Sequence, residues 1–207
     1  MKSNTKKRNG GVRGTKESII DTARRLFSEY SYLGISMDDI AKKLNITKAA
    51  LYYHYTGKAE IYEKVLDDVF HNLKLVITEA LNETTIDKRL FKLINNYLNF
   101  GAKEKNLIKA LIVRLPPAEH KLSLHISSLL EQVSNLIQPV MKEVSTSKMI
   151  TKKVDDRLLT SLLISMMNGL LLEYAFLNKK LDPTRIADQI ITVFFADISP
   201  IPSNTNG

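Results

Sequence analysis

The sequence predicts an all-α protein with a small N-terminal helical domain and a larger C-terminal one. Apolar residues recur at helical spacing through most of the chain, and the breaks fall at Pro, Gly and short polar runs. No segment shows the alternating pattern of a half-buried strand. The 207 residues are 44% hydrophobic, which is enough for a packed core. Cysteine is absent, which excludes disulfides and thiolate metal sites and fits a reducing compartment.

The positive charge is concentrated in the first part of the chain. The net charge is +8, and residues 1–60 hold 12 Lys or Arg against 6 Asp or Glu. The remaining residues hold 18 against 16 and are nearly balanced. This distribution indicates that the N-terminal domain meets a polyanion.

The chain begins with a segment that we expect to be a disordered basic arm, residues 1–14. It combines Lys and Arg with Asn, Ser and Gly, and it has no apolar stretch that would suggest a secretory signal. Apolar residues between Ile19 and Phe27 then fall at helical spacing. They predict a first helix over about 16–30.

Two short helices follow, joined by a tight connection. Ser36 with Asp39 three residues later indicates a capping box at the start of one helix, and Thr47 is the expected N-cap of the next. Asn45 between them can take the left-handed conformation that ends a helix. Residues 36–55 therefore have the pattern of a helix-turn-helix.

The pattern in the rest of the chain predicts longer helices separated by polar or proline-containing breaks. Pro139 lies inside one of them and should kink or split it, and the tail 199–207 is expected to be disordered. The predicted ranges are about 58–81, 86–102, 105–115, 118–145, 154–178 and 183–197.

The uncharged run 158–172 allows two interpretations. Its length approaches that of a membrane span, but it contains Ser, Thr and Asn and is short of the usual ~18 residues. A helix that is apolar nearly all round is otherwise buried, within a core or between subunits. The second interpretation is favoured, and Gly169 would let another backbone approach closely.

The third helix divides its side chains between two faces. On a helical wheel, Leu51 and Tyr55 point with Ile46 toward the small core, and His54 lies at the border. The opposite face holds Lys48, Ala49, Tyr52 and Tyr53. Small residues, a lysine and tyrosine hydroxyls suit a DNA groove, whereas the same tyrosines could simply cover the domain's own surface. Spacing alone leaves both possibilities open.

The run from Ile19 to Leu66, IIDTARRLFSEYSYLGISMDDIAKKLNITKAALYYHYTGKAEIYEKVL, resembles the N-terminal domain of the TetR family of transcriptional regulators. The resemblance covers about 16–66 and implies a three-helix DNA-binding domain over 15–66. It implies base-edge contacts for Lys48 and Ala49. It also implies contacts with the phosphate backbone of the DNA for Thr47, Tyr52, Tyr53, His54 and Lys58. Ser36 and Met37 of the second helix are expected to support these contacts. Asn45 and Gly57 depart from the family's usual Gly and Ser.

For residues 67–198 the resemblance implies a helical domain that binds an effector and dimerises. The expected partners are an operator, a small-molecule effector and a second copy through helices 154–178 and 183–197. The expected function is a cytoplasmic, ligand-responsive repressor that needs no cofactor. Candidate pocket residues, each of which could equally be ordinary core or surface, are Tyr97, Phe100, Arg114, Met141, Met166, Met167, Asn168 and Glu173.

Two alternative functions were weighed. An enzyme is disfavoured because the sequence shows no phosphate loop, nucleophile elbow or dinucleotide fingerprint. His71, His120 and His125 lack the spacing of a metal site, so no metal and no catalytic residue is expected. A constitutive DNA-binding or architectural protein without an effector is the stronger alternative.

Overall fold

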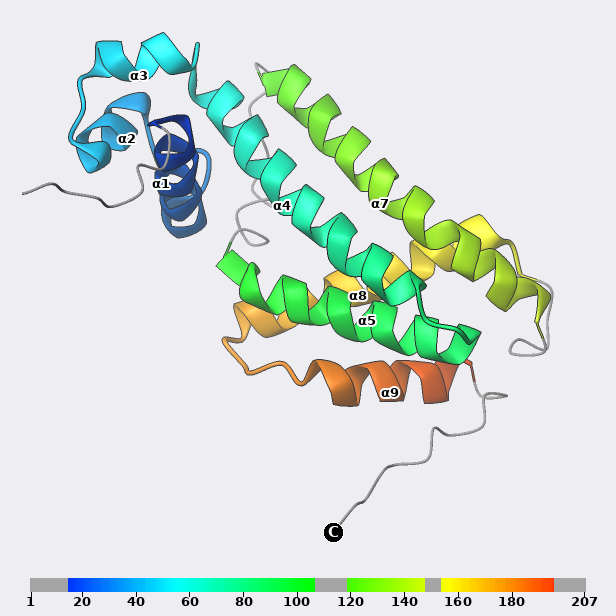
Figure 1. Ribbon diagram of the computed structural model, residues 1–207. Coiled ribbons are helices and arrows are strands. Elements are labelled where there is room, and N and C mark those ends of the chain that lie inside the picture. Colours follow the sequence, from blue (N-terminus) through cyan, green and yellow to red (C-terminus); the bar gives the residue numbers. More distant parts are fainter. Residues whose placement is uncertain (1–14, 107–118, 148–153, 196–207) are drawn as a thin grey trace, which may run out of the picture.

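The protein is described by a computed structural model over residues 15–106, 119–147 and 154–195, and its regular elements in these ranges are all α-helices (Figure 1). This confirms the predicted fold class. The helices are α1 (Thr15–Tyr30), α2 (Met37–Leu44), α3 (Lys48–His54), α4 (Lys58–Leu81), α5 (Ile86–Lys103), α7 (His120–Thr146), α8 (Asp156–Phe176) and α9 (Pro183–Phe194).

Most helix boundaries follow from local signals. α8 begins after Asp155, whose carboxylate accepts the Leu158 N–H at 2.9 Å, and α9 begins after Asp182 with Pro183 in its first turn. α7 runs through Pro139 without a break. Of the two expected effects of this proline, a kink or a split, the split does not occur. One proline removes a single backbone hydrogen bond, and packing of the apolar face holds the remaining turns together.

Parts of the prediction fall outside the described residues. The arm 1–14 and the tail 199–207 lie there, and so does nearly all of the helix expected over 105–115. α8 and α9 are shorter than their predicted ranges by a few residues.

α1, α2 and α3 form a small domain at one end of the molecule, where α1 packs against α2 and α4 (Figure 1). Three aromatic rings connect this domain to α4. The ring centroids of Phe27 and Tyr62 are 4.6 Å apart, and those of Tyr32 and Tyr62 are 5.0 Å apart. A side chain at Gly34 would place its Cβ 2.0 Å from the carbonyl oxygen of Tyr30, so the connection between α1 and α2 requires glycine.

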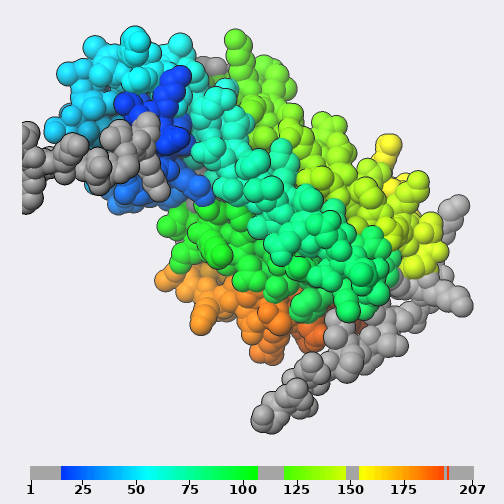
Figure 2. Space-filling view, in the orientation of Figure 1, coloured from blue at the N-terminus to red at the C-terminus, as the bar shows by residue number. Residues whose placement is uncertain are grey.

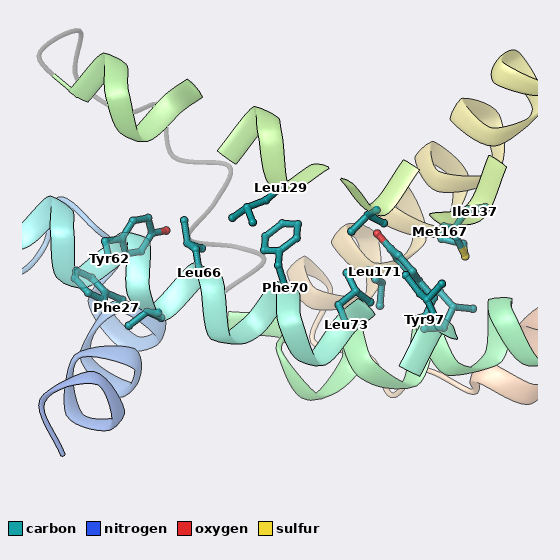
Figure 3. Packing of buried hydrophobic residues seen from close by; sticks show 14 of the residues in the cluster. Phe27, Tyr62, Leu66, Phe70, Leu73, Tyr97, Leu129, Ile137, Met167 and Leu171 are labelled. Atoms are coloured by element: carbon teal, nitrogen blue, oxygen red, sulfur yellow. The ribbon is translucent and has the colours of Figure 1, made fainter. Parts of the chain in front are cut away.

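The larger domain is built along α4, which extends from the small domain across the molecule (Figures 1 and 2). α4 packs on α5 and α7, α7 packs on α8, and α5 packs on α8 and α9. Leu66, Phe70 and Leu73 line the α4 face that meets the other helices (Figure 3). A Cβ on Gly101 of α5 would lie 2.2 Å from Leu171 of α8, so glycine permits the close approach of these helices.

α8 is the one helix in the described ranges that is long and apolar enough to cross a membrane by length and composition. Its mean hydropathy is 1.4, and only 28% of that apolar window is buried within the single chain. A core helix of a soluble subunit would be mostly buried. Much of the apolar surface of α8 is therefore exposed in the single chain.

Candidate DNA interface and ligand pocket

The N-terminus of α2 is fixed by the capping box that the sequence predicts. Ser36 Oγ accepts the Asp39 N–H at 3.2 Å, and Asp39 Oδ2 accepts the Ser36 N–H at 2.8 Å. The hydrogen bonds from Ser36 lower the pKa of the Asp39 carboxyl. These contacts hold the start of α2 in one orientation.

The turn between α2 and α3 is fixed in a similar way. Asn45 has φ 56° and ψ 41°, the left-handed conformation that its short polar side chain tolerates. The next N–H, of Ile46, donates to the Ala41 carbonyl at 3.1 Å. Thr47 then caps α3 by accepting the Ala50 N–H at 3.1 Å. The sequence therefore determines the angle between the two helices through local hydrogen bonds.

The two faces of α3 separate as the wheel predicts. Leu51 is fully buried and Tyr55 is 7% exposed, whereas Tyr53 is 86% exposed. Tyr52 is 46% exposed, and Lys48 and Ala49 are also exposed. α3 thus displays a lysine, a small residue and two tyrosines beside one another. This surface has the shape and the chemistry of a major-groove reading helix.

Neighbouring residues orient two of these displayed side chains. Lys48 Nζ lies 3.0 Å from Asp38 Oδ1, and this hydrogen bond raises the pKa of Lys48. The Tyr53 ring meets His54 edge-on, with centroids 5.1 Å apart. Asp38 was not singled out from the sequence, because no local signal indicates that α2 would bring it to Lys48.

Met37 and Lys58 are expected DNA-contact residues, but neither side chain is freely displayed on the surface. Met37 is 7% exposed and belongs to the core, so its side chain is not displayed on the surface. Lys58 is half-buried, and its ammonium donates to the carbonyl oxygens of Tyr32 at 2.8 Å and Ile35 at 3.0 Å. It also lies 4.2 Å from the Tyr32 ring centroid, and burial lowers its pKa. Lys58 therefore holds the α1–α2 connection against α4.

The start of α4 lacks a side-chain cap at Gly57, as the departure from Ser suggested. Glu60 replaces part of that function. Its Oε2 accepts the Thr56 N–H at 2.6 Å and the Thr56 hydroxyl at 2.7 Å. A carboxylate in the first turn also interacts favourably with the helix dipole.

A pocket of about 570 Å³ lies in the larger domain between α4, α5, α7 and α8. Its walls are mainly apolar, with Phe70 and Leu73 from α4, Ile126 from α7 and Leu172 from α8 among the lining residues. This volume and lining are typical of sites for small organic molecules.

One polar pair in the pocket wall joins the buried Tyr97 to the exposed Asn168. The Tyr97 hydroxyl donates to Asn168 Oδ1 at 2.8 Å, and Tyr97 is 6% exposed. Burial raises the pKa of Tyr97 to about 12. Ser134, Ser161 and Ser165 add hydroxyl groups to the wall. The pocket can therefore orient a ligand by a few hydrogen bonds between mainly apolar walls.

The candidate pocket residues divide into three groups. Tyr97, Phe100 and Asn168 line the pocket. Met141 and Met167 are fully buried core residues, and Met166 packs against the core, because all three follow the apolar side of their helices. Glu173 is exposed, and Arg114 lies outside the described residues. None of the last five is among the described lining residues.

The histidines do not form a metal site within the part of the chain that is described. No group of three or more His, Asp or Glu could hold a metal ion there. His125 Nε2 instead lies 2.7 Å from Asp67 Oδ1 and links α7 to α4.

Residues 19–65 match the family described as bacterial regulatory proteins, tetR family. The biofilm operon icaADBC HTH-type negative transcriptional regulator IcaR of Staphylococcus aureus (strain Newman) is 34% identical over 132 residues, which are 63% of this chain and 67% of that protein. The chain belongs to the TetR family of transcriptional regulators.

A second IcaR and a solved structure extend the comparison. IcaR of Staphylococcus epidermidis is 54% identical over 56 residues, which are 27% of this chain and only 30% of that protein. The crystal structure of a transcriptional regulator FadR from Bacillus subtilis in complex with stearoyl-CoA has a TM-score of 0.74 and 17% identity. It covers 88% of this chain and 99% of the other. At that identity the likeness shows the fold.

Two side-chain contacts join the DNA-binding domain of this TetR-family protein to its larger domain. Arg24 of α1 forms an ion pair with Glu104, the residue that follows α5. The Tyr32 hydroxyl donates to Glu119, just before α7, at 2.5 Å, and burial together with this carboxylate raises the Tyr32 pKa. Sequence reasoning missed both, since the partners are 80 and 87 residues apart.

Proposed function

We propose that the protein is a ligand-responsive repressor that binds a pseudo-palindromic operator as a homodimer and is released from it by a small-molecule effector. The observation that carries this proposal is the exposed face of α3. The capped start of α3 and its buried opposite side hold this face in place. Among the described residues this face contributes little to the core, since Tyr52 and Tyr53 remain 46% and 86% exposed. The basic N-terminal part of the sequence supplies the long-range attraction to DNA.

Within this proposal the residues of α3 have two kinds of contact. Lys48 and Ala49 face the base edges, because a small residue lets the helix axis approach the groove and a lysine can reach an acceptor. Thr47, Tyr52, Tyr53 and His54 face the phosphates. The hydroxyls of Ser36 and Thr47 are already engaged as caps, so these residues act mainly by fixing the starts of α2 and α3 against the DNA.

Dimerisation is supported by the apolar surface of α8 and α9. Large side chains on or just after these helices remain about half exposed or more in the single chain, namely Leu158, Leu162, Phe176, Leu177 and Val193. A second copy packed through both helices would remove this surface from water and is favoured at roughly 25 cal/mol per Å². We therefore assign α8 and α9 to the subunit interface and the protein to the cytoplasm, rather than to a membrane.

Repression and effector release have separate support. The two IcaR relatives are named as negative regulators, which favours repression. The pocket with its Tyr97–Asn168 pair favours a small-molecule effector over a constitutive DNA-binding protein, which needs no pocket of ligand size.

The function can be tested with an operator selected from random duplexes by the purified protein. We expect one dimer, or a multiple, to bind half-sites separated by about one helical turn, measured by fluorescence anisotropy and sedimentation. Transcription in vitro from a promoter that contains this operator should fall when the protein is added. Selection that recovers no sequence in common would contradict the proposal.

Two variants should distinguish contacts with the DNA bases from contacts with the DNA phosphates. Tyr53→Ala should weaken binding to operator and scrambled duplexes alike, by about tenfold, because a lost phosphate contact carries no sequence information. Lys48→Ala should weaken binding to the operator more than binding to the scrambled duplex, since one base contact contributes about 1–3 kcal/mol of discrimination. Anisotropy titrations on both duplexes measure this. Equal losses for the two variants would contradict the division of roles.

A further inference from the structure

Glu104 belongs to both functional regions of the molecule. It follows the last turn of α5, lines the ligand pocket, and pairs with Arg24 of α1 in the DNA-binding domain. Its side chain is 18% exposed and that of Arg24 is 30% exposed. This partly buried carboxylate has a positive partner, and that partner comes from the DNA-binding domain.

The pocket offers no second charge among its described lining residues. Apart from Glu104 these residues are apolar or carry hydroxyl, amide or phenol groups. A ligand's anionic group would therefore approach the Glu104 carboxylate with no lysine or arginine among the described lining residues to offset the repulsion, which is unfavourable between apolar walls. A ligand's ammonium group would approach a favourable partner at the same place.

We propose that the effector has an apolar body and a cationic head, and that its head takes Glu104 from Arg24. This inference rests on the proposed function and adds to it the chemical class of the effector and the step that transmits its binding. The apolar body occupies the walls formed by residues such as Phe70 and Phe100. Without Glu104, Arg24 no longer holds α1 to the end of α5, and the position of the DNA-binding domain changes.

The competition must act in both directions. The ligand's cation and Arg24 compete for the carboxylate of Glu104. The ligand therefore weakens the Arg24–Glu104 contact, and Arg24 weakens ligand binding by the same factor. Removing Arg24 should then tighten ligand binding, whereas removing the charge of Glu104 should abolish the preference for a cation. A purely structural role of the ion pair predicts neither result.

The experiment uses decylammonium, decanol and decanoate, which share one alkyl chain and differ only in the head group. Calorimetric titration below micellar concentrations should show decylammonium binding the full-length protein about tenfold more tightly than decanol. Decanoate should bind more weakly than decanol. Decylammonium should also lower the affinity for the selected operator.

The variants then assign the effect to the pair. Glu104→Gln should bind decylammonium and decanol alike, and Arg24→Gln should bind decylammonium several-fold more tightly than the wild type does. Glu143→Gln is the matched control, because its carboxylate pairs with Arg89 between α5 and α7 and does not line the pocket. It should behave like the wild type.

Three results would overturn the inference: equal binding of amine and alcohol to the wild type, a cation preference that persists in Glu104→Gln, or no tightening in Arg24→Gln. The proposed function fails separately. If decanol in the pocket lowers operator affinity, the effector function stands even when the charge preference is absent. If no ligand that occupies the pocket changes operator affinity, the effector function itself is contradicted.

Discussion

A Gly169→Arg protein is expected to be monomeric and to lose tight binding to the two-half-site operator. Gly169 is exposed on α8, and no atom lies within 4 Å of the position that a Cβ would occupy. The subunit alone can therefore accept the arginine. In a dimer through α8 the same side chain would separate the helices and bury an unpaired charge.

The expected effect is large. Burial of a charge without a partner costs about 3–5 kcal/mol, which corresponds to more than a hundredfold weaker dimer. Sedimentation and operator titration on one preparation measure both consequences. Weak binding to any duplex should remain, since the basic surface of each monomer is unchanged.

Gly169 also lines the pocket, so a second variant is needed to separate the two roles. Leu162→Asp changes an α8 side chain that is 55% exposed and is not among the pocket residues. It should also yield monomers. Leu124→Asp on α7 is the matched control, because Leu124 is 57% exposed and belongs to neither of the two helices assigned to the interface. If Gly169→Arg and Leu162→Asp both remained dimeric, as the control should, α8 would not be the interface.

Lys58→Ala is expected to lower both stability and DNA affinity. The ammonium of Lys58 donates to the carbonyl oxygens of Tyr32 and Ile35, and removing it leaves both without this donor. Charged hydrogen bonds of this kind contribute about 2 kcal/mol, so the free energy of unfolding in urea should fall by roughly that amount. The connection that leads into α2 would also be less fixed, which should weaken binding to operator and scrambled duplexes alike.

The stability measurement decides what Lys58 does. A lysine that only contacts phosphate would leave the unfolding free energy unchanged when it is removed. Lys64→Ala is a suitable control, because Lys64 carries the same charge on α4 and forms only an exposed ion pair with Asp67 at 3.1 Å. That pair is expected to contribute less than about 1 kcal/mol. Loss of DNA affinity without loss of stability would show that Lys58 acts on the phosphates directly.

Features that depend on residues close in sequence could be predicted. The capping box of Ser36 and Asp39, the left-handed Asn45 and the Thr47 cap each involve partners within about four residues, so the sequence alone determines them. The bounds of α4 follow from a long apolar stripe that starts at the break of Thr56 and Gly57. The division of α3 into a buried and an exposed face follows from helical periodicity.

Features that depend on packing between distant helices could not be predicted. Tyr97 and Asn168 are candidate pocket residues from the sequence, but the hydrogen bond that joins them connects α5 to α8 across 71 residues. Met141 and Met167 are candidates on the same footing, and both are core residues. Composition identifies unusual residues, whereas helix packing decides which of them face a cavity.

The sequence by itself determined the helices, their caps and the surface that α3 presents, since these rest on hydrogen bonds and periodicity within one segment. Only the tertiary structure decided that Lys58 points into the α1–α2 connection and that Glu104 faces the pocket while it pairs with Arg24. The direction of a long charged side chain depends on which carbonyl or counter-charge the fold brings within reach. Partners that are tens of residues away leave no local pattern in the sequence.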